Sequence, residues 1–302
     1  MAYLLIGLFS IKPLYNLLKK EKPDYLVVHL LTFIPFILLI LFNFKTKFIL
    51  RVSGYPKMNL FREILWKLAS KKIYKVFCPT KETMNSLGSK DIFEKNKLLV
   101  IEDPIVEISK IQKKRLEKVQ DFLMDKKFIL GIGRLSTQKN FTLLLNFFKI
   151  ESAKDPDLLL VIAGEGELKK QFNKFIIKNK MDNKIILLGY QKNIHNLLRK
   201  CFCFILTSNW EDPGFVLIEA AINNASIISS DCPSGPKEIL RGGEGGVLFD
   251  SKNLLSLQES YKKFKNLSKN EIYLKKVSSK KVAVDYTIFR HYKKLNYFFN
   301  EN

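Results

Sequence analysis

The segment Phe128-Ile-Leu-Gly-Ile-Gly-Arg-Leu-Ser-Thr-Gln-Lys-Asn140 joins a short apolar run to the start of a stretch with helical spacing. A short run of continuous apolar residues is typical of a strand buried on both faces of a parallel sheet. The same alternation continues downstream, with apolar runs at 158–163, 185–188, 202–206 and 226–229 and amphipathic stretches at 169–178, 194–199 and 214–223. Strands alternating with helices predict a doubly wound parallel sheet.

The first hundred residues show a similar alternation. We expect helices at 14–20 and 59–69 and strands at 25–30, 48–52, 75–78 and 98–101. The sequence therefore predicts two Rossmann-like α/β domains facing a cleft, at 1–107 and 108–285, followed by a packing helix at 286–302. A lysine-rich helix at 108–124 is the expected connection. Ligands of such sheets bind beyond the carboxyl ends of the strands.

Composition narrows the class of protein. Of the 302 residues 47% are hydrophobic, so the chain is too apolar to be disordered. The 51 Lys+Arg against 29 Asp+Glu give a net charge of +22, which indicates attraction to phosphate in nucleic acid, anionic lipid or a phosphorylated substrate. The lysines are dispersed along the chain and no zinc-finger or RNA-binding signature is present, which disfavours nucleic acid as a partner.

The cysteine and histidine spacings do not indicate a metal site. Cys78, Cys201, Cys203 and Cys232 form no C-x-x-C pair, and the three histidines lie far apart in the sequence. We therefore expect reduced core cysteines, a cytoplasmic protein and no metal held by protein ligands.

The stretch Tyr25–Phe44 contains no Lys, Arg, Asp or Glu and is about long enough to span a bilayer. Thr32 and Pro35 divide it, so we expect a strand, a loop and an apolar helix from Ile34. Insertion of that helix at the membrane interface, or a full span, remains an alternative. The apolar residues 1–10 lack the basic start and cleavage site of a signal peptide.

Two glycine turns follow consecutive predicted strands. In the first, Gly133 is followed by Arg134 and Lys139, which offer positive charge beside a turn that lets backbone approach an anion. The second contains Gly164 and Gly166 in the same topological position. Tandem turns of this kind suit a nucleotide lying across the strand ends, although tight structural turns with solvated cations explain the pattern nearly as well.

The segment Thr207-Ser-Asn-Trp-Glu-Asp-Pro-Gly-Phe-Val-Leu-Ile-Glu219 places a carboxylate on each side of a predicted helix start. The helix N-terminus would hold a diphosphate, Glu219 would accept hydrogen bonds from ribose hydroxyls, and Glu211 would meet the hydroxyls of a sugar. The alternative is that the acidic residues merely favour the helix dipole.

With these motifs, the chain resembles the retaining nucleotide-sugar glycosyltransferases of family 4, which have the two-domain GT-B fold. The resemblance rests on Gly133-Arg-Leu with Gln138-Lys-Asn140, Ala163-Gly-Glu-Gly166, the Glu-x7-Glu pair and Ser230-Asp-Cys-Pro-Ser-Gly-Pro-Lys-Glu-Ile239, within residues 127–250. It implies that the counterparts of Arg134 and Lys139 stabilise the departing diphosphate in place of a metal. The residues assigned on this basis are Arg134, Lys139 and Glu211 as catalytic and Gly133, Gly164, Gly166, Tyr190, Pro213, Gly214, Phe215, Val216 and Glu219 as donor-binding.

The amino-terminal half departs from the family pattern. Lys22–His29 looks like a middle strand of the acceptor domain. The resemblance therefore implies that 1–107 is an incomplete acceptor-side domain, without the opening strand and its glycine turn, and that 108–285 is the nucleotide-sugar-binding domain. A family-like catalytic His is expected near the end of the strand at 48–52, where this chain has Arg51 and Ser53. Three explanations are open. The start of the chain is misplaced, the acceptor domain is truncated, or Arg51 and Ser53 serve the acceptor side in another way than the family's histidine.

The motifs and the resemblance together imply a metal-independent, retaining hexosyltransferase without a cofactor, using a nucleotide diphosphate sugar, with UDP favoured. The acceptor would be lipid-linked or a saccharide in surface polysaccharide or lipopolysaccharide synthesis, met peripherally at the cytoplasmic face of the inner membrane, with dispersed lysines near anionic lipid. Three alternatives remain open: a truncated donor-binding protein without transferase activity, a basic nucleic-acid binder and an integral membrane protein.

Overall fold

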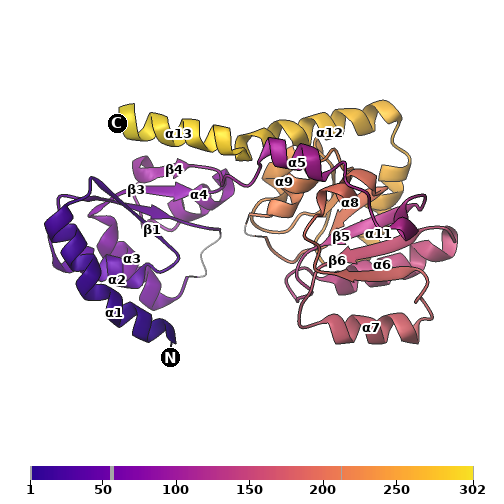
Figure 1. Ribbon diagram of the computed structural model, residues 1–302, viewed down its shortest axis with the longest axis horizontal. Coiled ribbons are helices and arrows are strands. Elements are labelled where there is room, and N and C mark those ends of the chain that lie inside the picture. Colours follow the sequence, from indigo (N-terminus) through magenta and orange to yellow (C-terminus); the bar gives the residue numbers. More distant parts are fainter. Residues whose placement is uncertain (1, 55–57, 212, 302) are drawn as a thin grey trace. The chain divides into compact units, whose positions relative to one another are not determined.

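The computed structural model describes residues 2–54, 58–211 and 213–301 (Figure 1). The chain divides into two compact units, residues 1–102 and 103–302, which are described separately below.

The first unit contains a four-stranded parallel sheet in the order β1-β2-β3-β4. Its strands are β1 (Tyr25–His29), β2 (Lys47–Arg51), β3 (Ile73–Cys78) and β4 (Leu98–Val100), which confirms the four predicted strands. Its α-helices are α1 (Ala2–Asn16), continued by a π-helical segment Leu17–Glu21, α2 (Phe33–Leu41), α3 (Leu60–Ser70) and α4 (Lys81–Gly88). Helix α4 was not predicted from the sequence, and the strand order has no reversal.

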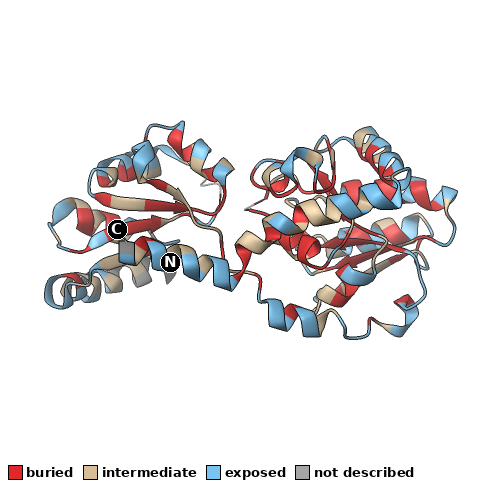
Figure 2. Cartoon of the chain, turned by 90° about the horizontal axis from the view of Figure 1, so that it is seen from above, coloured by how far each residue is buried: buried red, intermediate tan, exposed pale blue. Residues whose placement is uncertain are grey.

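Side-chain hydrogen bonds cap the N-termini of two helices in this unit, α3 and α4. The Asn59 side chain accepts a hydrogen bond from the backbone N–H of Arg62 and caps α3, and Thr80 caps α4 in the same way. Phe36, Phe48 and Trp66 pack in one buried cluster with the inward residues of the strands. Figure 2 shows the buried residues of both units in red.

The uncharged stretch 25–44 forms strand β1, a short loop and helix α2, as predicted. Across the described parts of the chain, no helix is both long enough and apolar enough to cross a membrane. The loop residue Leu30 has φ 61°, a left-handed conformation that is rare for a bulky side chain.

The second unit contains a six-stranded parallel sheet in the order β10-β9-β8-β5-β6-β7, which confirms the doubly wound prediction. The strands are β5 (Phe128–Ile132), β6 (Leu159–Ala163), β7 (Ile185–Gly189), β8 (Cys203–Leu206), β9 (Ile227–Ser230) and β10 (Val247–Phe249). The chain begins at the centre with β5 and continues outward through β6 and β7. It then returns to the other side of β5 with β8 and continues outward through β9 and β10. In sheets of this kind, ligands bind at the carboxyl ends of the strands where the order reverses.

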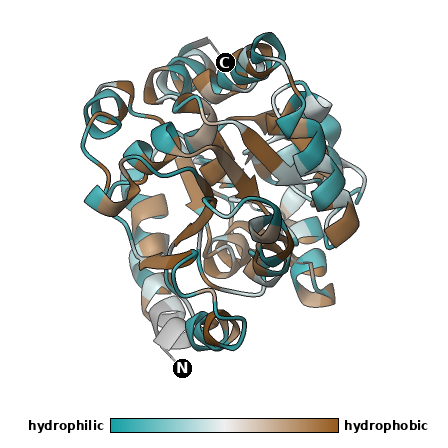
Figure 3. Ribbon diagram, turned by 90° about the vertical axis from the view of Figure 1, so that its right-hand side faces the viewer, coloured by the Kyte–Doolittle hydropathy of each residue, from teal (hydrophilic) through white to brown (hydrophobic). Residues whose placement is uncertain are grey.

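Helices cover both faces of this sheet, and apolar strands lie between more polar helices in Figure 3. The helices of this unit are α5 (Ile108–Lys114), α6 (Phe141–Lys154), α7 (Lys169–Lys178), α8 (His195–Lys200), α9 (Phe215–Ile222), α10 (Pro236–Ile239), α11 (Leu254–Lys265), α12 (Lys269–Ala283) and α13 (Ile288–Glu301). One buried cluster joins the sheet to α6, α7 and α11, and a second joins it to α8 and α9. The clusters bury continuous apolar strands on both sides, as the sequence pattern predicts.

The predicted helix at 108–124 is wrong beyond residue 114. Helix α5 ends at Lys114, and only a short 3-10 turn follows at Asp121–Leu123. Side chains from the β7–α8 region bind the carbonyl groups of this segment: Asn193 donates to Lys114 O at 2.8 Å and Asn196 donates to Lys118 O at 2.9 Å. These tertiary bonds satisfy carbonyls that a continued helix would have used internally.

Candidate functional site

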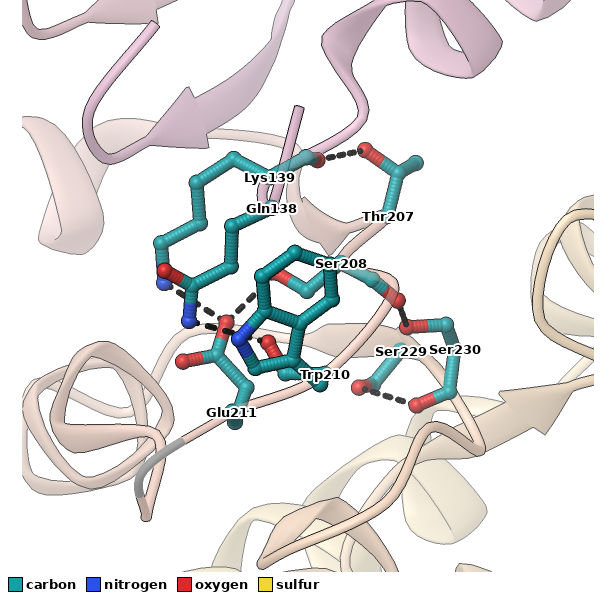
Figure 4. Close-up of polar contacts among 8 residues, drawn as sticks. All are labelled: Gln138, Lys139, Thr207, Ser208, Trp210, Glu211, Ser229 and Ser230. Carbon is teal, nitrogen blue, oxygen red and sulfur yellow. Dashed lines mark hydrogen bonds and ion pairs between the residues drawn. The ribbon is translucent and has the colours of Figure 1, made fainter. Parts of the chain in front are cut away.

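The loops that follow β5 and β8 are bonded to each other at the reversal point of the sheet. The backbone N–H of Asn209 donates to Gln138 O at 2.7 Å, and the Gln138 side chain donates to Trp210 O at 3.1 Å. The Thr207 hydroxyl donates to Lys139 O at 2.9 Å (Figure 4). Residues 137–140 and 207–210 therefore form one bonded structure, although about 70 residues separate them in the sequence.

Lys139 and Glu211 form a buried ion pair at the centre of this structure. Lys139 Nζ lies 2.6 Å from Glu211 Oε1, and the side chains are only 15% and 4% exposed. The Ser208 hydroxyl donates to the same carboxylate oxygen. Figure 4 shows the ammonium and the hydroxyl converging on Glu211. The two residues predicted for diphosphate and sugar recognition thus lie in direct contact.

The end of β9 and the loop that follows it also bind the segment that carries Glu211. The backbone N–H of Glu211 donates to Pro233 O at 3.0 Å, and the Ser230 hydroxyl donates to Ser208 O at 2.8 Å. Gly235 has φ 120°, and a Cβ atom there would lie 1.9 Å from Pro213 O. Only glycine fits this close approach, so the motif 230–239 holds the Glu211 loop in place.

Helix α9 begins beside this ion pair. Gly214 caps it with φ 95°, so Phe215 and Val216 lie in the first turn, where a helix has no internal acceptors for its N–H groups. The helix dipole and these donors suit a phosphate.

Glu219 lies one turn further along α9. Burial raises the pKa of its carboxyl group to about 7, and nearby Lys114 and Lys139 act in the opposite direction. Neither lysine, nor any other cation in the described ranges, forms a direct ion pair with it. A carboxylate that is costly to ionise and lacks such a partner is suited to binding hydroxyl donors of a ligand.

The glycine turns after β5 and β6 pack against one another. Gly164 has φ 151°, and a Cβ atom there would lie 1.9 Å from the carbonyl oxygen of Gly133. At Gly166 a Cβ atom would lie 2.4 Å from Leu135 O, and at Gly133 it would meet the Lys139 side chain at 2.9 Å. Close backbone packing alone therefore requires glycine at 164 and 166, whereas Gly133 makes room for Lys139.

We predict that Gly164→Ala destabilises the chain by about 3 kcal/mol or more, because the new methyl group overlaps fixed backbone. Gly242→Ala is the matched control, since Gly242 has φ 63° but no atom lies within 4 Å of the position that a Cβ would take there. That control should cost only about 1–2 kcal/mol of left-handed strain. Urea unfolding measures both values, and equal losses would contradict the proposed overlap.

Arg134 and Tyr190 lie at the rim of the site. The Arg134 side chain is 76% exposed, and its Nε lies 3.4 Å from Glu167 Oε2. Tyr190 is 78% exposed and directly follows β7. The backbone N–H of Gly164 donates to Gly189 O at 2.8 Å, which links the Tyr190 turn to the second glycine turn.

In the first unit, Arg51 ends β2 and Ser53 follows it. Arg51 pairs in register with His29 at the end of β1. Burial lowers the pKa of Arg51, and burial together with the Arg51 charge lowers the pKa of His29. The sequence pattern leads us to expect a histidine at the end of β2. The structure has Arg51 there, and a histidine, His29, lies beside it at the end of the adjacent strand β1.

Sequence reasoning missed three contributors to the site: Ser208, Gln138 and Lys114. Ser208 and Gln138 belong to the motifs that supply the predicted residues, so those motifs could have indicated them. Lys114 comes from α5, far away in the sequence, and no local signal marks it. Within the described ranges, no three His, Cys, Asp or Glu side chains gather closely enough to hold a metal ion.

A doubly wound domain with this switch-point site, together with a second parallel α/β unit, matches solved structures of glycosyltransferases with the GT-B class of fold. The family Glycosyl transferases group 1 matches residues 112–281, more than half of the chain. The chain belongs to this family.

Two curated relatives extend the similarity into the first unit. An uncharacterized glycosyltransferase of Methanocaldococcus jannaschii is 35% identical over 252 residues, covering 76% of this chain and 62% of the relative. The N-acetylgalactosamine-N,N'-diacetylbacillosaminyl-diphospho-undecaprenol 4-alpha-N-acetylgalactosaminyltransferase of Campylobacter jejuni is 28% identical over 229 residues, covering 74% and 61%. The chain thus matches about three fifths of the length of these relatives.

A solved structure shows the same fold. The Anabaena protein Alr3699/HepE, crystallised in complex with UDP-glucose, matches with a TM-score of 0.69 and 14% identity, over 85% of this chain and 73% of the other. At this identity the likeness concerns the fold alone.

Proposed function

We propose that this protein is a retaining glycosyltransferase that moves a hexose from a nucleotide diphosphate sugar, with UDP favoured, and needs no metal. The observation that carries the proposal is the buried Lys139–Glu211 pair at the sheet's reversal point, beside the start of α9. A buried cation beside a helix N-terminus suits a phosphate, and the adjacent carboxylate suits the hydroxyl groups of a sugar.

The charges of the site fit a departing diphosphate. In the proposed reaction the bond between the sugar's anomeric carbon and the diphosphate oxygen breaks, and the acceptor oxygen bonds to the same face of that carbon. The leaving phosphate takes the acceptor's proton. Lys139, Arg134 and the first N–H groups of α9 offset the charge that develops on the phosphate. The protein therefore orients the groups and stabilises the leaving group.

The donor's two ends match the two carboxylates. Glu219 would accept hydrogen bonds from the ribose hydroxyls, Glu211 would position the sugar, and the exposed Tyr190 turn would lie beside the base. The UDP-glucose complex of the structural relative supports this choice of donor class.

We further propose that the acceptor is lipid-linked or a saccharide and is met at the cytoplasmic membrane face. The Campylobacter relative is named for a substrate carried on diphospho-undecaprenol, a lipid diphosphate, which supports a lipid-linked acceptor. A charge of +22 favours peripheral contact with anionic lipid. Arg51 and Ser53, at the carboxyl edge of the first sheet, are the proposed acceptor-side residues.

The test incubates the full chain with a panel of UDP-sugars and lipid phosphate or saccharide acceptors and follows the anomeric proton by NMR. Transfer with an α-linked product from an α-linked donor, undiminished by EDTA, supports the proposal. An inverted anomer contradicts the retaining mechanism. Nucleotide binding by calorimetry without transfer to any acceptor would instead indicate a donor-binding protein without activity.

We predict that Arg134→Ala lowers kcat by about 10²–10³-fold, because a cation near the leaving diphosphate is lost. Folding should be unaffected, since Arg134 is highly exposed. Arg241→Ala is the control: it removes another exposed Arg–Glu pair, 3.2 Å long, at Glu244. Unchanged turnover in Arg134→Ala, or an equal loss in the control, would overturn the role of Arg134.

A further inference from the structure

A large apolar groove lies in the first unit, apart from the residues assigned to the donor. It has a volume of about 1010 Å³ and is lined by Leu14 and Leu17, by Leu31 and Phe33, and by Phe61 and Arg62. These residues come from the α1 region, from the loop and start of α2, and from the start of α3. The volume reaches the upper end of the roughly 300–1,000 Å³ typical of ligand pockets.

The apolar side chains of this groove are unusually exposed. Leu30 is 71% exposed, Leu31 58% and Phe61 62%. Contiguous exposed apolar surface of this kind marks an interaction site. Leu30 also has the strained φ of 61°, which points to a function for this loop and not to a relaxed turn.

The lining of the groove also includes a cation. Arg62 lines it, as does Asn59, which caps the first turn of α3. Both residues belong to the start of this 11-residue helix, where the helix N-terminus adds partial positive charge. The groove therefore combines an apolar lining with a cation and hydrogen-bond donors, the complement of an amphiphile with an anionic head group.

We propose that this groove binds the hydrocarbon chain of a lipid-linked acceptor, with the lipid's phosphate at Arg62 and the start of α3. The inference rests on the proposed glycosyltransferase function and selects the lipid-linked acceptor class over a free saccharide. Charge complementarity and concave shape identify a single long-chain lipid phosphate as the occupant. A flat bilayer contact needs neither the groove nor a cation in its lining.

The experiment measures binding of the full chain to neutral phosphatidylcholine vesicles that contain undecaprenyl phosphate. Vesicles in which phosphatidylglycerol supplies the same negative charge are the comparison. We expect at least about tenfold tighter binding to the polyprenyl phosphate vesicles, because burying a few CH₂ groups in the groove adds that much. Equal binding to both vesicles would show that charge alone attracts the protein and would overturn the proposal.

Two leucine variants make the test specific. Leu31→Gln removes an apolar side chain from the groove, and Leu68→Gln removes one of similar exposure, 54%, that is not among the lining residues. We expect about a tenfold loss of lipid binding for Leu31→Gln and none for Leu68→Gln. Equal losses, or a dimer of this chain that Leu31→Gln dissociates, would contradict the assignment.

A groove-filling variant and a donor assay complete the design. Ser10 also lines the groove, so Ser10→Trp should block the lipid while adding apolar surface. Arg62→Gln should abolish the preference for undecaprenyl phosphate over undecaprenol. Binding of a UDP-sugar, measured by calorimetry without lipid, depends on the second unit. Donor binding without lipid binding therefore refutes only the groove assignment, and lipid binding without donor binding refutes the proposed function.

Discussion

Lys139→Met is expected to destabilise the chain by about 3–5 kcal/mol, because it leaves the Glu211 carboxylate buried without its cation. Glu211 is only 4% exposed, so water cannot take over the role of the ammonium group. Methionine keeps most of the side-chain volume, so the loss reports charge and not packing. Urea unfolding of the ligand-free protein measures the effect.

The double variant Lys139→Met/Glu211→Gln separates stability from function. It should recover much of the lost stability, since no unpaired buried charge remains, while turnover stays at least about 10²-fold below that of the natural chain. The control is Lys169→Met, which breaks the exposed Lys169–Glu165 pair of 2.8 Å. That pair should contribute no more than about 1 kcal/mol. Additive effects of the two site substitutions would refute the coupling between Lys139 and Glu211.

Glu219→Gln is expected to remove the pH dependence of donor binding and to weaken it at pH 8. Because the pKa of Glu219 is about 7, a ligand that binds the carboxylate should lose affinity about tenfold per pH unit as the pH falls below 7. Calorimetry should use an intact UDP-sugar and not UDP, whose terminal phosphate titrates near pH 6. Glu259→Gln, on the exposed surface of α11, is the control and should leave the profile unchanged.

The same substitution should stabilise the ligand-free protein at high pH. The pKa of Glu219 is raised above its unfolded value of 4.5, so the native state binds the proton more tightly and loses stability as the pH rises from 4.5 to 7. Removing the charge should therefore raise the free energy of unfolding at pH 8 by up to about 3 kcal/mol, with the gain vanishing near pH 4. A pH-independent difference between the two proteins would contradict the raised pKa.

The sequence predicted the strands well because parallel strands buried on both faces leave a clear local signal. Phe128–Ile132 and Leu159–Ala163 are continuous apolar runs followed by glycine turns, and both form strands. The helix expected at 108–124 failed because its carbonyls are bound by Asn193 and Asn196, which are distant in the sequence. Local pattern cannot show such tertiary competitors.

The sequence named candidate site residues one by one but did not predict their geometry. Lys139 and Glu211 follow from separate motifs and were expected to meet separate ligand groups, whereas the structure shows them bonded to each other. Their contact depends on β5 and β8 being neighbours, although β6 and β7 lie between them in the chain. The pKa of Glu219 depends on burial and on Lys114, and neither follows from the Glu-x7-Glu spacing.

The bonds between the loop segments 137–140 and 207–210 constrain any redesign of the proposed donor preference. Gln138, Thr207 and Asn209 fix each loop through the backbone of the other. A loop transplanted alone from a homologue would meet a partner shaped for a different sequence. The two loop segments and the turn at 230–236 that supports them therefore have to be exchanged together.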